Sequence, residues 1–272
     1  MNIAKMIVMD LDGTLLNEKS RVSQQTKEYL GELKQNGYII VIATGRILKS
    51  ALIATDGADF ANYIVTDAGA AVYKKQNEEW KEMYADLIPR KIAEDMIYEF
   101  NDDKFMYVDI CSKNYIDMYA TKHSYEELFI RKYIDKNKIL NNINEIIHIS
   151  VAFWKNEFTR EYKKIFSERY PELEVTIMQD SFDDFQWLEI LKKGVSKYKG
   201  IFTISQIENI ENKDIIAFGD GLNDIDMIEK CGVGVAMKNA LPEVKEKSNF
   251  VTDKTNLEDG IIEFLAKFLT NN

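Results

Sequence analysis

The alternation of apolar and polar residues divides the chain into two kinds of segment. Short, wholly apolar runs occupy the first part of the sequence, and such runs are typical of strands buried on both faces. We expect strands at Met6–Met9, Tyr38–Ala43 and Tyr63–Thr66. Residues Ser23–Asn36 carry apolar side chains at helical spacing, with Ser23 as a candidate N-cap. Strand, helix and strand in this order predict a parallel sheet covered by helices, the doubly wound α/β class.

The middle of the chain follows a different pattern. Apolar and polar residues alternate there, as in strands that bury only one face. The expected strands are Phe105–Asp109, Tyr115–Tyr119, Ile146–Phe153 and Val175–Met178, and the expected helices are Arg90–Phe100, Tyr125–Tyr133 and Glu157–Tyr170. Wholly apolar runs return at Ile215–Phe218, Gly232–Ala236 and Phe250–Val251, before a predicted helix at Leu257–Leu269. The pattern predicts a core domain of residues 1–82 and 186–272 with a smaller α+β domain, residues 83–185, inserted into it.

Composition narrows the possible partners. The 272 residues include 35 basic and 45 acidic side chains, a formal net charge of −10. This balance argues against nucleic acid as a partner, because binding to a polyanion relies on an excess of Lys and Arg. The apolar runs are far shorter than the roughly 20 residues of a membrane-spanning helix. Since the first residues also lack the apolar core of a signal peptide, we expect a cytoplasmic protein without membrane contact.

Polar side chains follow three of the predicted core strands. Asp10 and Asp12 come after the first strand, Thr44 after the second, and Asp220, Asn223 and Asp224 after the run IIAF. Ligands of doubly wound sheets bind outside the carboxyl ends of the strands, so these residues form the candidate site.

The charge of this candidate site predicts a cation. Carboxylates a few ångströms apart repel one another and would also repel a phosphate dianion. Mg²⁺ resolves the conflict, since it prefers oxygen ligands and is usually held by one or two carboxylates together with a substrate phosphate. Asp10 and Asp220 are the natural side-chain ligands. The two cysteines, Cys111 and Cys231, lack the spacing of a zinc site, and His123 and His148 are isolated.

Four motifs carry a family resemblance. DLDGTL (Asp10–Leu15), ATGR (Ala43–Arg46), GVSK (Gly194–Lys197) and GDGLND (Gly219–Asp224) resemble the motifs of the haloacid dehalogenase-like (HAD) phosphohydrolases. They are most similar to the Cof-type subfamily, in which a large α/β cap is inserted into a Rossmann-like core between the second and third motifs. Residues 83–185 match that cap in layout only. Asp67-Ala68-Gly69 replaces the Asn-Gly usual after the third strand.

The resemblance implies a role for each site residue. Asp10 would attack phosphorus and form an aspartyl-phosphate, while Asp12 would serve as general acid and base. Mg²⁺ would be held by Asp10, Asp220 and the backbone carbonyl of Asp12. The phosphate would be bound by Thr44, Asn223, Lys197 and the amides of Leu11 and Gly45. Asp224 would orient Lys197 or a water molecule from outside the metal's own ligands.

The implied function is therefore Mg²⁺-dependent hydrolysis of a small phosphorylated metabolite, such as a sugar phosphate or a phosphorylated cofactor. Two alternatives remain open at this point. A phosphosugar mutase would return the phosphoryl group to a sugar hydroxyl, and a noncatalytic regulator would only bind a metal or phosphate. The sequence leaves open the physiological substrate, the cap residues that select it, the oligomeric state and whether Arg46 contacts substrate.

Overall fold

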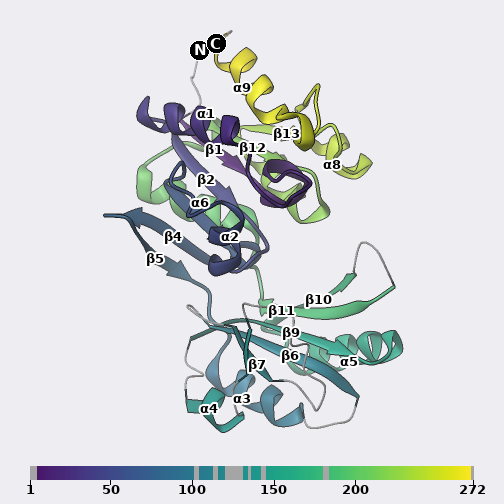
Figure 1. The fold of residues 1–272 in the computed structure, drawn as a ribbon. Coiled ribbons are helices and arrows are strands. Elements are labelled where there is room, and N and C mark those ends of the chain that lie inside the picture. Colours follow the sequence, from purple (N-terminus) through teal and green to yellow (C-terminus); the bar gives the residue numbers. More distant parts are fainter. Residues whose placement is uncertain are drawn as a thin grey trace. The chain divides into compact units, whose positions relative to one another are not determined.

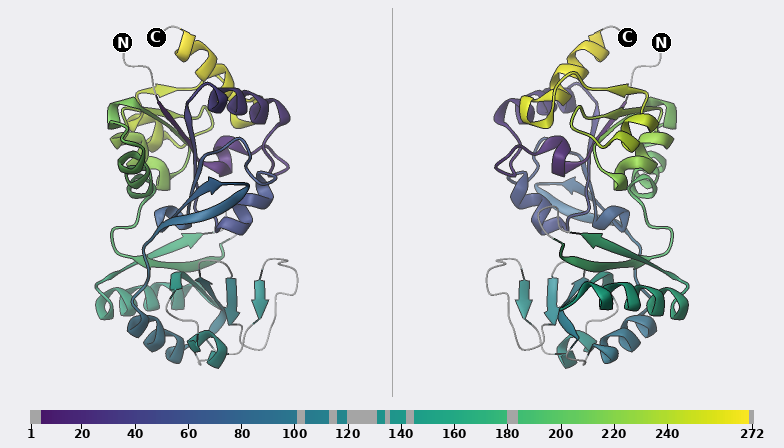
Figure 2. Two further views of the ribbon diagram at one scale, coloured as in Figure 1. Left: turned by 90° about the vertical axis from the view of Figure 1, so that its left-hand side faces the viewer. Right: turned by 90° about the vertical axis from the view of Figure 1, so that its right-hand side faces the viewer.

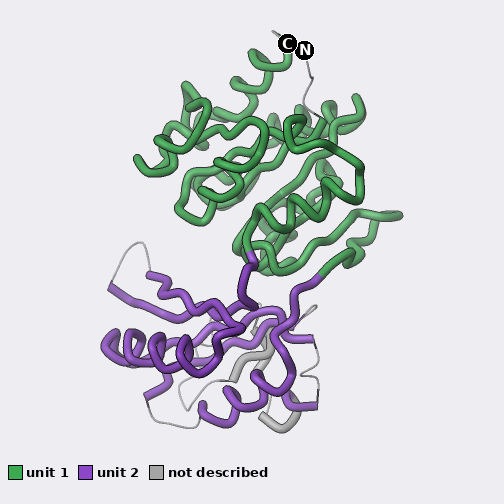
Figure 3. Tube along the Cα trace, turned by 180° about the vertical axis from the view of Figure 1, so that it is seen from behind, with its two compact units in different colours: residues 1–84, 196–272 green, residues 85–195 purple. Residues whose placement is uncertain are grey.

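The computed structural model describes residues 5–100, 104–112, 116–119, 131–133, 136–141, 145–179 and 184–270. The chain forms two compact units, residues 1–84 with 196–272, and residues 85–195 (Figure 3). The first unit therefore resumes at residue 196, whereas the sequence pattern predicts that it resumes at residue 186. The reason is that strand β11 (Gln186–Lys192) pairs with two strands of the second unit.

The first unit is built on an eight-stranded sheet. Its order is β14-β13-β12-β1-β2-β3-β4-β5 (Figure 1). The strands span Phe250–Val251 (β14), Val233–Ala236 (β13), Ile215–Gly219 (β12), Met6–Met9 (β1), Ile39–Ala43 (β2), Tyr63–Thr66 (β3), Ala71–Gln76 (β4) and Glu79–Ala85 (β5). The strands from β14 to β3 are parallel, and β4 runs antiparallel to β3. The six parallel strands are those that the apolar runs predict.

The pair β4–β5 is not predicted. The turn between these strands consists of Asn77 and Glu78, which both have positive φ, 49° and 67°. Two-residue hairpin turns of this kind usually contain glycine, which adopts positive φ without strain. Because Asn-Glu lacks that glycine, the sequence carries little hairpin signal at this point.

Helices cover both faces of the first sheet (Figure 2). On one face, Ile7 and Met9 of β1 pack in a core with α1 (Gln24–Gln35), α2 (Leu48–Ala54), α8 (Pro242–Lys247) and α9 (Gly260–Thr270). On the other face, Met6 and Val8 pack with α6 (Lys197–Glu208) and α7 (Ile225–Lys230). Successive side chains of a strand point to opposite faces, so a strand covered on both sides must be apolar throughout. The predicted doubly wound α/β class is confirmed.

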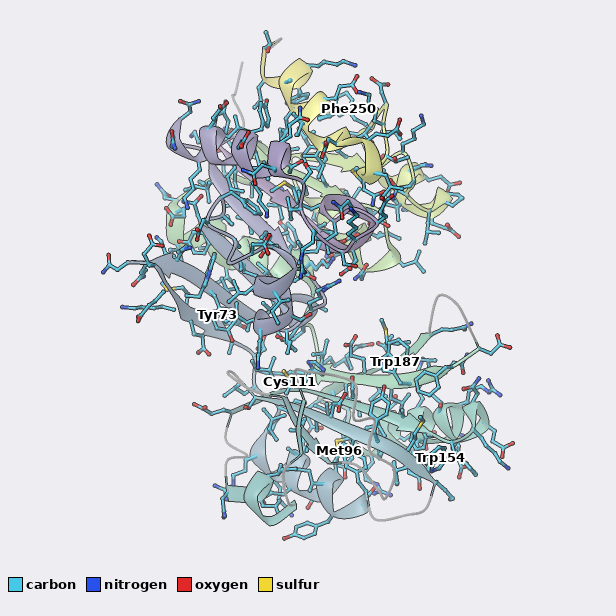
Figure 4. All side chains as sticks on the ribbon, viewed as in Figure 1. Tyr73, Met96, Cys111, Trp154, Trp187 and Phe250 are labelled. Atoms are coloured by element: carbon cyan, nitrogen blue, oxygen red, sulfur yellow. The ribbon has the colours of Figure 1, made fainter. Side chains whose placement is uncertain are left out.

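The second unit contains a six-stranded sheet in the order β10-β11-β9-β6-β7-β8. Its elements are α3 (Arg90–Glu99), β6 (Phe105–Ser112), β7 (Ile116–Tyr119), β8 (Arg131–Tyr133), α4 (Lys136–Asn141), β9 (Ile146–Phe153), α5 (Asn156–Arg169), β10 (Leu173–Gln179) and β11. All neighbours pair antiparallel except β7 and β8. Met96 of α3, labelled in Figure 4, belongs to the core that packs against this sheet. Phe166 of α5 is part of the same core. This unit has the α+β character that the alternating pattern predicts.

Two predicted helices differ from the structure. Of the helix expected at Tyr125–Tyr133, residues 125–130 lie outside the described part, and the prediction is wrong for the last three residues, which form β8. Pairing with β7 outweighs their local helical spacing. The last helix begins at Gly260 and not at Leu257, because Asp259 adopts a left-handed conformation with φ 53°. Within the described residues, no helix has the length and apolar composition needed to cross a bilayer.

Two glycines of the first unit provide a matched test of its packing. A Cβ on Gly234 of β13 would lie 2.0 Å from the carbonyl oxygen of Ile228 in α7, whereas a Cβ on Gly31 of α1 meets nothing within 4 Å. We expect Gly234→Ala to destabilise the protein by about 1–3 kcal/mol, since the strand and helix backbones must separate. Gly31→Ala should stabilise it by about 0.5–1 kcal/mol, because alanine favours the helix. Urea unfolding measures both, and equal effects of the two substitutions would contradict this packing.

Candidate active site

The ends of three adjacent parallel strands form the candidate site. β1 pairs with β12 on one side and with β2 on the other. Asp10 directly follows β1, Asp220 follows β12, and Thr44 follows β2. The amide of Asp10 still donates to the carbonyl oxygen of Phe218 at 3.0 Å, which ties the site to the sheet. The topology therefore places the three motifs at one edge, as the sequence predicts.

The loop after β1 is shaped to fit against Asp220. Gly13 has φ 76°, a left-handed conformation, and a Cβ there would lie 2.2 Å from Oδ2 of Asp220. The Thr14 hydroxyl donates to Oδ1 of the same carboxylate at 2.7 Å. On the other side of the loop, the Asn239 side chain donates to the carbonyl oxygen of Gly13 at 2.7 Å. The Gly-Thr pair of the DLDGT motif is thus required by the close packing of Asp220.

Lys197 joins two of the acidic residues. Its ammonium donates to Oδ1 of Asp10 and to Oδ1 of Asp224, each at 2.6 Å. All three residues are buried, and the lysine side chain is fully enclosed. A solvated lysine on a basic surface stretch would not have this environment. The lysine of the GVSK motif therefore lies at the centre of the site.

Asp224 forms a bridge between Lys197 and the turn that carries Asp220. Its second oxygen, Oδ2, accepts hydrogen bonds from the amides of Asp220 and Gly221, both at 3.0 Å. With Oδ1 bonded to the lysine, both oxygens of this buried carboxylate are engaged within the protein. Asp224 is consequently suited to holding other site residues in place.

Negative charge is in excess at the site. Burial raises the pKa of Asp10 to about 8, against the opposing effect of Lys197, and the nearby Asp224 carboxylate adds to the rise. Burial also raises the pKa of Asp220 to about 6, although the hydrogen bond from Thr14 opposes this. Burial disfavours the charged form of Lys197, but Asp10 and Asp224 outweigh it, so the pKa of the lysine is raised. One ammonium thus stands against three carboxylates.

The donor set fits a hard divalent cation. Oxygen atoms of Asp10, Asp220 and Asp224 all lie within 4.8 Å of one another. Because Asp224 is already saturated by Lys197 and two amides, Asp10 and Asp220 are the better placed of the three to bind a metal. Carboxylate oxygens are the ligands that Mg²⁺ prefers, and a dication would offset the surplus negative charge.

Asp12 lies in a different environment from Asp10. Its side chain is 57% exposed and forms a two-pronged ion pair with Arg46, in which Nε donates to Oδ2 at 2.8 Å and Nη2 donates to Oδ1 at 2.6 Å. These hydrogen bonds raise the pKa of the arginine. The role of Arg46 is open from the sequence alone, and the structure shows that this side chain fixes the orientation of the Asp12 carboxylate.

The other predicted residues, Leu11, Thr44, Gly45 and Asn223, lie at the same edge of the sheet. Among the described residues, no side-chain hydrogen bond joins them to the acidic cluster. The Thr44 hydroxyl accepts a hydrogen bond from the Arg46 amide at 3.1 Å, and Gly45 lies between these two residues. The Leu11 side chain is buried in the core, which leaves only its backbone to face a ligand. Asn223 is exposed on the turn between Asp220 and Asp224.

The loop after β3 supports the site from a position that the sequence motifs did not single out. Asp67, Ala68 and Gly69 all have positive φ, at 49°, 54° and 111°. Their amides bond back to the ATGR segment, since Asp67 donates to the Arg46 carbonyl and Ala68 to the Thr44 carbonyl. A Cβ on Gly69 would lie 1.9 Å from the carbonyl oxygen of Ser196. Glycine at the last position was the one available signal of this close approach.

Comparison with known proteins agrees with this arrangement. A family model described as haloacid dehalogenase-like hydrolase matches residues 7–265. The chain is 27% identical to each of two Bacillus subtilis proteins named 5-amino-6-(5-phospho-D-ribitylamino)uracil phosphatase, YitU and YcsE. These alignments cover 97% of this chain and 97% and 96% of the relatives. A crystal structure from Thermotoga maritima superposes with a TM-score of 0.81 at 26% identity, over 97% of both chains. The chain belongs to the haloacid dehalogenase-like hydrolase family.

Proposed function

We propose that this protein is a Mg²⁺-dependent phosphatase that hydrolyses small phosphorylated metabolites through an aspartyl-phosphate. The observation that carries the proposal is the buried Asp10 carboxylate, held at 2.6 Å by Lys197 beside Asp220. A carboxylate fixed in this way is a suitable nucleophile, because its attack needs no rearrangement of the surrounding side chains.

The first step is attack by an Asp10 oxygen on phosphorus. The new O–P bond gives the aspartyl-phosphate, and the bond from phosphorus to the leaving oxygen breaks. Asp12 donates a proton to that oxygen as it departs, from the carboxyl oxygen that has released its hydrogen bond from Arg46, while its other oxygen stays bonded to the arginine. In the second step Asp12 removes a proton from water, which attacks the same phosphorus and releases inorganic phosphate and free Asp10. The exposed side chain of Asp12 is suited to meeting both the leaving group and the water.

Positive charge around the phosphoryl group comes from two sources. Lys197 is already bonded to the nucleophile, so its ammonium would lie next to the oxygens of the transferring group. Asp10, Asp220 and the Asp12 carbonyl would hold Mg²⁺, which supplies further positive charge when bound. The Thr44 hydroxyl, the Asn223 side chain and the amides of Leu11 and Gly45 would bind the other phosphate oxygens.

The names of the relatives suggest the kind of substrate. Two relatives at 27% identity are named as phosphatases of a phosphorylated ribitylamino-uracil. We infer that this protein acts on a substrate of that chemical class or on a sugar phosphate, in the cytoplasm and without a nucleic-acid partner. In this proposal the first unit is the catalytic core, and the second unit, residues 85–195, is the cap that selects the substrate.

Replacement of the nucleophile tests the reaction directly. Asp10→Asn should abolish phosphate release, because an amide does not attack phosphorus under these conditions, and at least a 1000-fold loss of kcat is expected. Phosphate released from a panel of sugar phosphates and phosphorylated ribityl compounds, with Mg²⁺ and with water as the sole acceptor, is the measurement. The control is Asp56→Asn, an aspartate whose side chain is 59% exposed. Turnover by Asp10→Asn at the wild-type rate would exclude this nucleophile, and inactivity of the wild type on the whole panel would favour a binding protein.

Arg46 gives a second test, which concerns the orientation of Asp12. Arg46→Ala should lower kcat by about 10-fold to 100-fold with a smaller change in KM, because a misplaced proton donor slows the chemical step. Arg46→Lys should restore little, since an ammonium does not make the two parallel bonds seen with Asp12. Arg21→Ala, an exposed arginine outside the site, is the control. An unchanged kcat in Arg46→Ala would show that Asp12 needs no such support.

The raised pKa values of Asp10 and Asp220 predict how pH affects metal binding and stability. The pKa of Asp10 rises from 3.8 to about 8, so between these values the folded metal-free protein binds a proton that the unfolded chain does not. This contribution to stability is complete below pH 4 and is lost as the pH rises through about 8. Mg²⁺ needs both carboxylates deprotonated, so its binding strengthens over the same range.

Thermal unfolding at several pH values measures both effects. In EDTA, the Tm of the wild type should fall relative to that of Asp10→Asn between pH 5 and pH 9. The rise in Tm on adding Mg²⁺ should be larger at pH 8.5 than at pH 6, and Asp220→Asn should reduce it at both. A Mg²⁺ effect that shrinks with rising pH would contradict the assigned ligands.

A further inference from the structure

We propose that Asp226 is a positioning residue for Lys197, which it controls by fixing the first turn of α6. The inference rests on the proposed function for its effect on kcat, whereas its effect on the position of Lys197 is independent of that function. Asp226 lies two residues beyond the GDGLND motif, in the first turn of α7. Among the described residues, it has no hydrogen bond to Asp10, Asp12 or the Lys197 ammonium. Its carboxylate acts on the backbone that carries the catalytic lysine.

The start of α6 provides the first observation. The first amides of a helix have no partners within the helix and must find acceptors elsewhere. The Lys199 amide donates to Oγ of the N-cap residue Ser196 at 3.3 Å. The Tyr198 amide donates to Oδ2 of Asp226 at 3.2 Å, which is a contact across 28 residues of sequence. Asp226 therefore completes the capping of this helix from a separate element.

The position of Lys197 makes this cap important for the site. Lys197 is the first residue of α6, between Ser196 and Tyr198. On one side, the Ser196 carbonyl is packed against Gly69, where a Cβ would approach it to 1.9 Å. On the other side, the Tyr198 amide is bonded to Asp226. The backbone on both sides of the lysine is thus fixed by residues from two other elements, the loop after β3 and helix α7, which limits where its ammonium can lie.

Asp224 and Asp226 act on the same lysine at its two ends. Asp224 accepts a hydrogen bond from the Lys197 ammonium at 2.6 Å. Asp226 accepts one at 3.2 Å from the backbone amide of the next residue, Tyr198. Both aspartates belong to the single stretch that leads from Asp220 into α7. That stretch therefore sets the side-chain end and the backbone end of Lys197 together, relative to the turn that would hold the metal.

The nature of the Asp226 side chain provides a second observation. Its other oxygen, Oδ1, is buried and has no hydrogen-bond partner among the described residues. A buried acceptor without a partner is unfavourable, so a side chain chosen for packing alone would avoid it. A carboxylate at the positive N-terminal end of a helix is favourable, and α6 supplies that end here.

The experiment compares Asp226→Ala with Asp226→Asn. The alanine variant loses the acceptor, while the amide oxygen of asparagine can still receive the Tyr198 hydrogen bond. We expect kcat for Asp226→Ala to fall by about 10-fold to 100-fold, with KM changed less than 3-fold, since displacement of Lys197 by an ångström affects mainly the transition state. Inhibition by orthovanadate, which imitates the pentacoordinate phosphorus, should weaken in parallel. Asp226→Asn should recover kcat to within about 3-fold of the wild type.

Asp259→Ala is the matched control. Asp259 accepts hydrogen bonds from Ser23 and Thr26 at the start of α1, so its removal disturbs a helix start of the same unit without touching Lys197. It should lower Tm and leave kcat unchanged. If Asp226→Ala also lowers Tm but keeps the wild-type kcat and orthovanadate inhibition, Asp226 serves only stability and the inference is wrong.

Crystal structures of the two Asp226 variants separate this inference from the proposed function. Asp226→Ala should show the Lys197 ammonium moved away from Asp10, and Asp226→Asn should retain the 2.6 Å contact. This comparison holds even if the wild type hydrolyses no phosphate ester, an outcome that would count against the proposed function alone. An unmoved lysine in Asp226→Ala would overturn the inference.

Discussion

The site depends on one ammonium group enclosed by more negative charge than it can neutralise. Lys197 is bonded to Asp10 and Asp224, and Asp220 lies in the same cluster. Burying unbalanced charge is costly, and the raised pKa values of Asp10 and Asp220 are the expression of that cost. The arrangement becomes favourable only when further positive charge arrives. In the proposed function that charge would come from Mg²⁺, which would offset the carboxylates before a phosphate dianion binds.

The fold makes that concentration of charge possible. Asp10 and Lys197 are separated by 187 residues, and the entire second unit lies between them in the chain. The adjacent parallel strands β1 and β12 end at the same edge, which brings their acidic turns together. Lys197 is the first residue of α6, a helix that packs on the face of the sheet formed by Met6 and Val8. The backbone of the lysine lies between the Ser196 carbonyl, which packs against Gly69, and the Tyr198 amide, which is bonded to Asp226.

Motifs and apolar runs predict those parts of the molecule that depend on local sequence. The run Met6–Met9 is apolar because helices cover both faces of β1, so strand and fold class follow from the pattern. Turns and strand pairings that depend on backbone conformation leave a weaker signal in the amino-acid sequence. The Asn77–Glu78 turn has no glycine, and the strand β11 begins at the predicted domain boundary, residue 186, although it pairs in the second sheet. The pairing of Arg46 with Asp12 required the structure, since a side-chain partner 34 residues away has no local signature.

The two aspartates of the DLDGT motif lie in different surroundings, and in the proposed reaction this difference would divide the work between nucleophile and proton donor. Asp10 is 5% exposed and fixed by Lys197, whereas the side chain of Asp12 is 57% exposed and paired with Arg46. A nucleophile benefits from enclosure, because water no longer competes for its lone pairs. A proton donor needs access to the leaving oxygen and then to water. The left-handed Gly13 lies against Asp220 and Thr14 bonds to it, whereas the side chain of Asp12, the residue before them, stays exposed. The chemical difference between the two aspartates therefore originates in their surroundings.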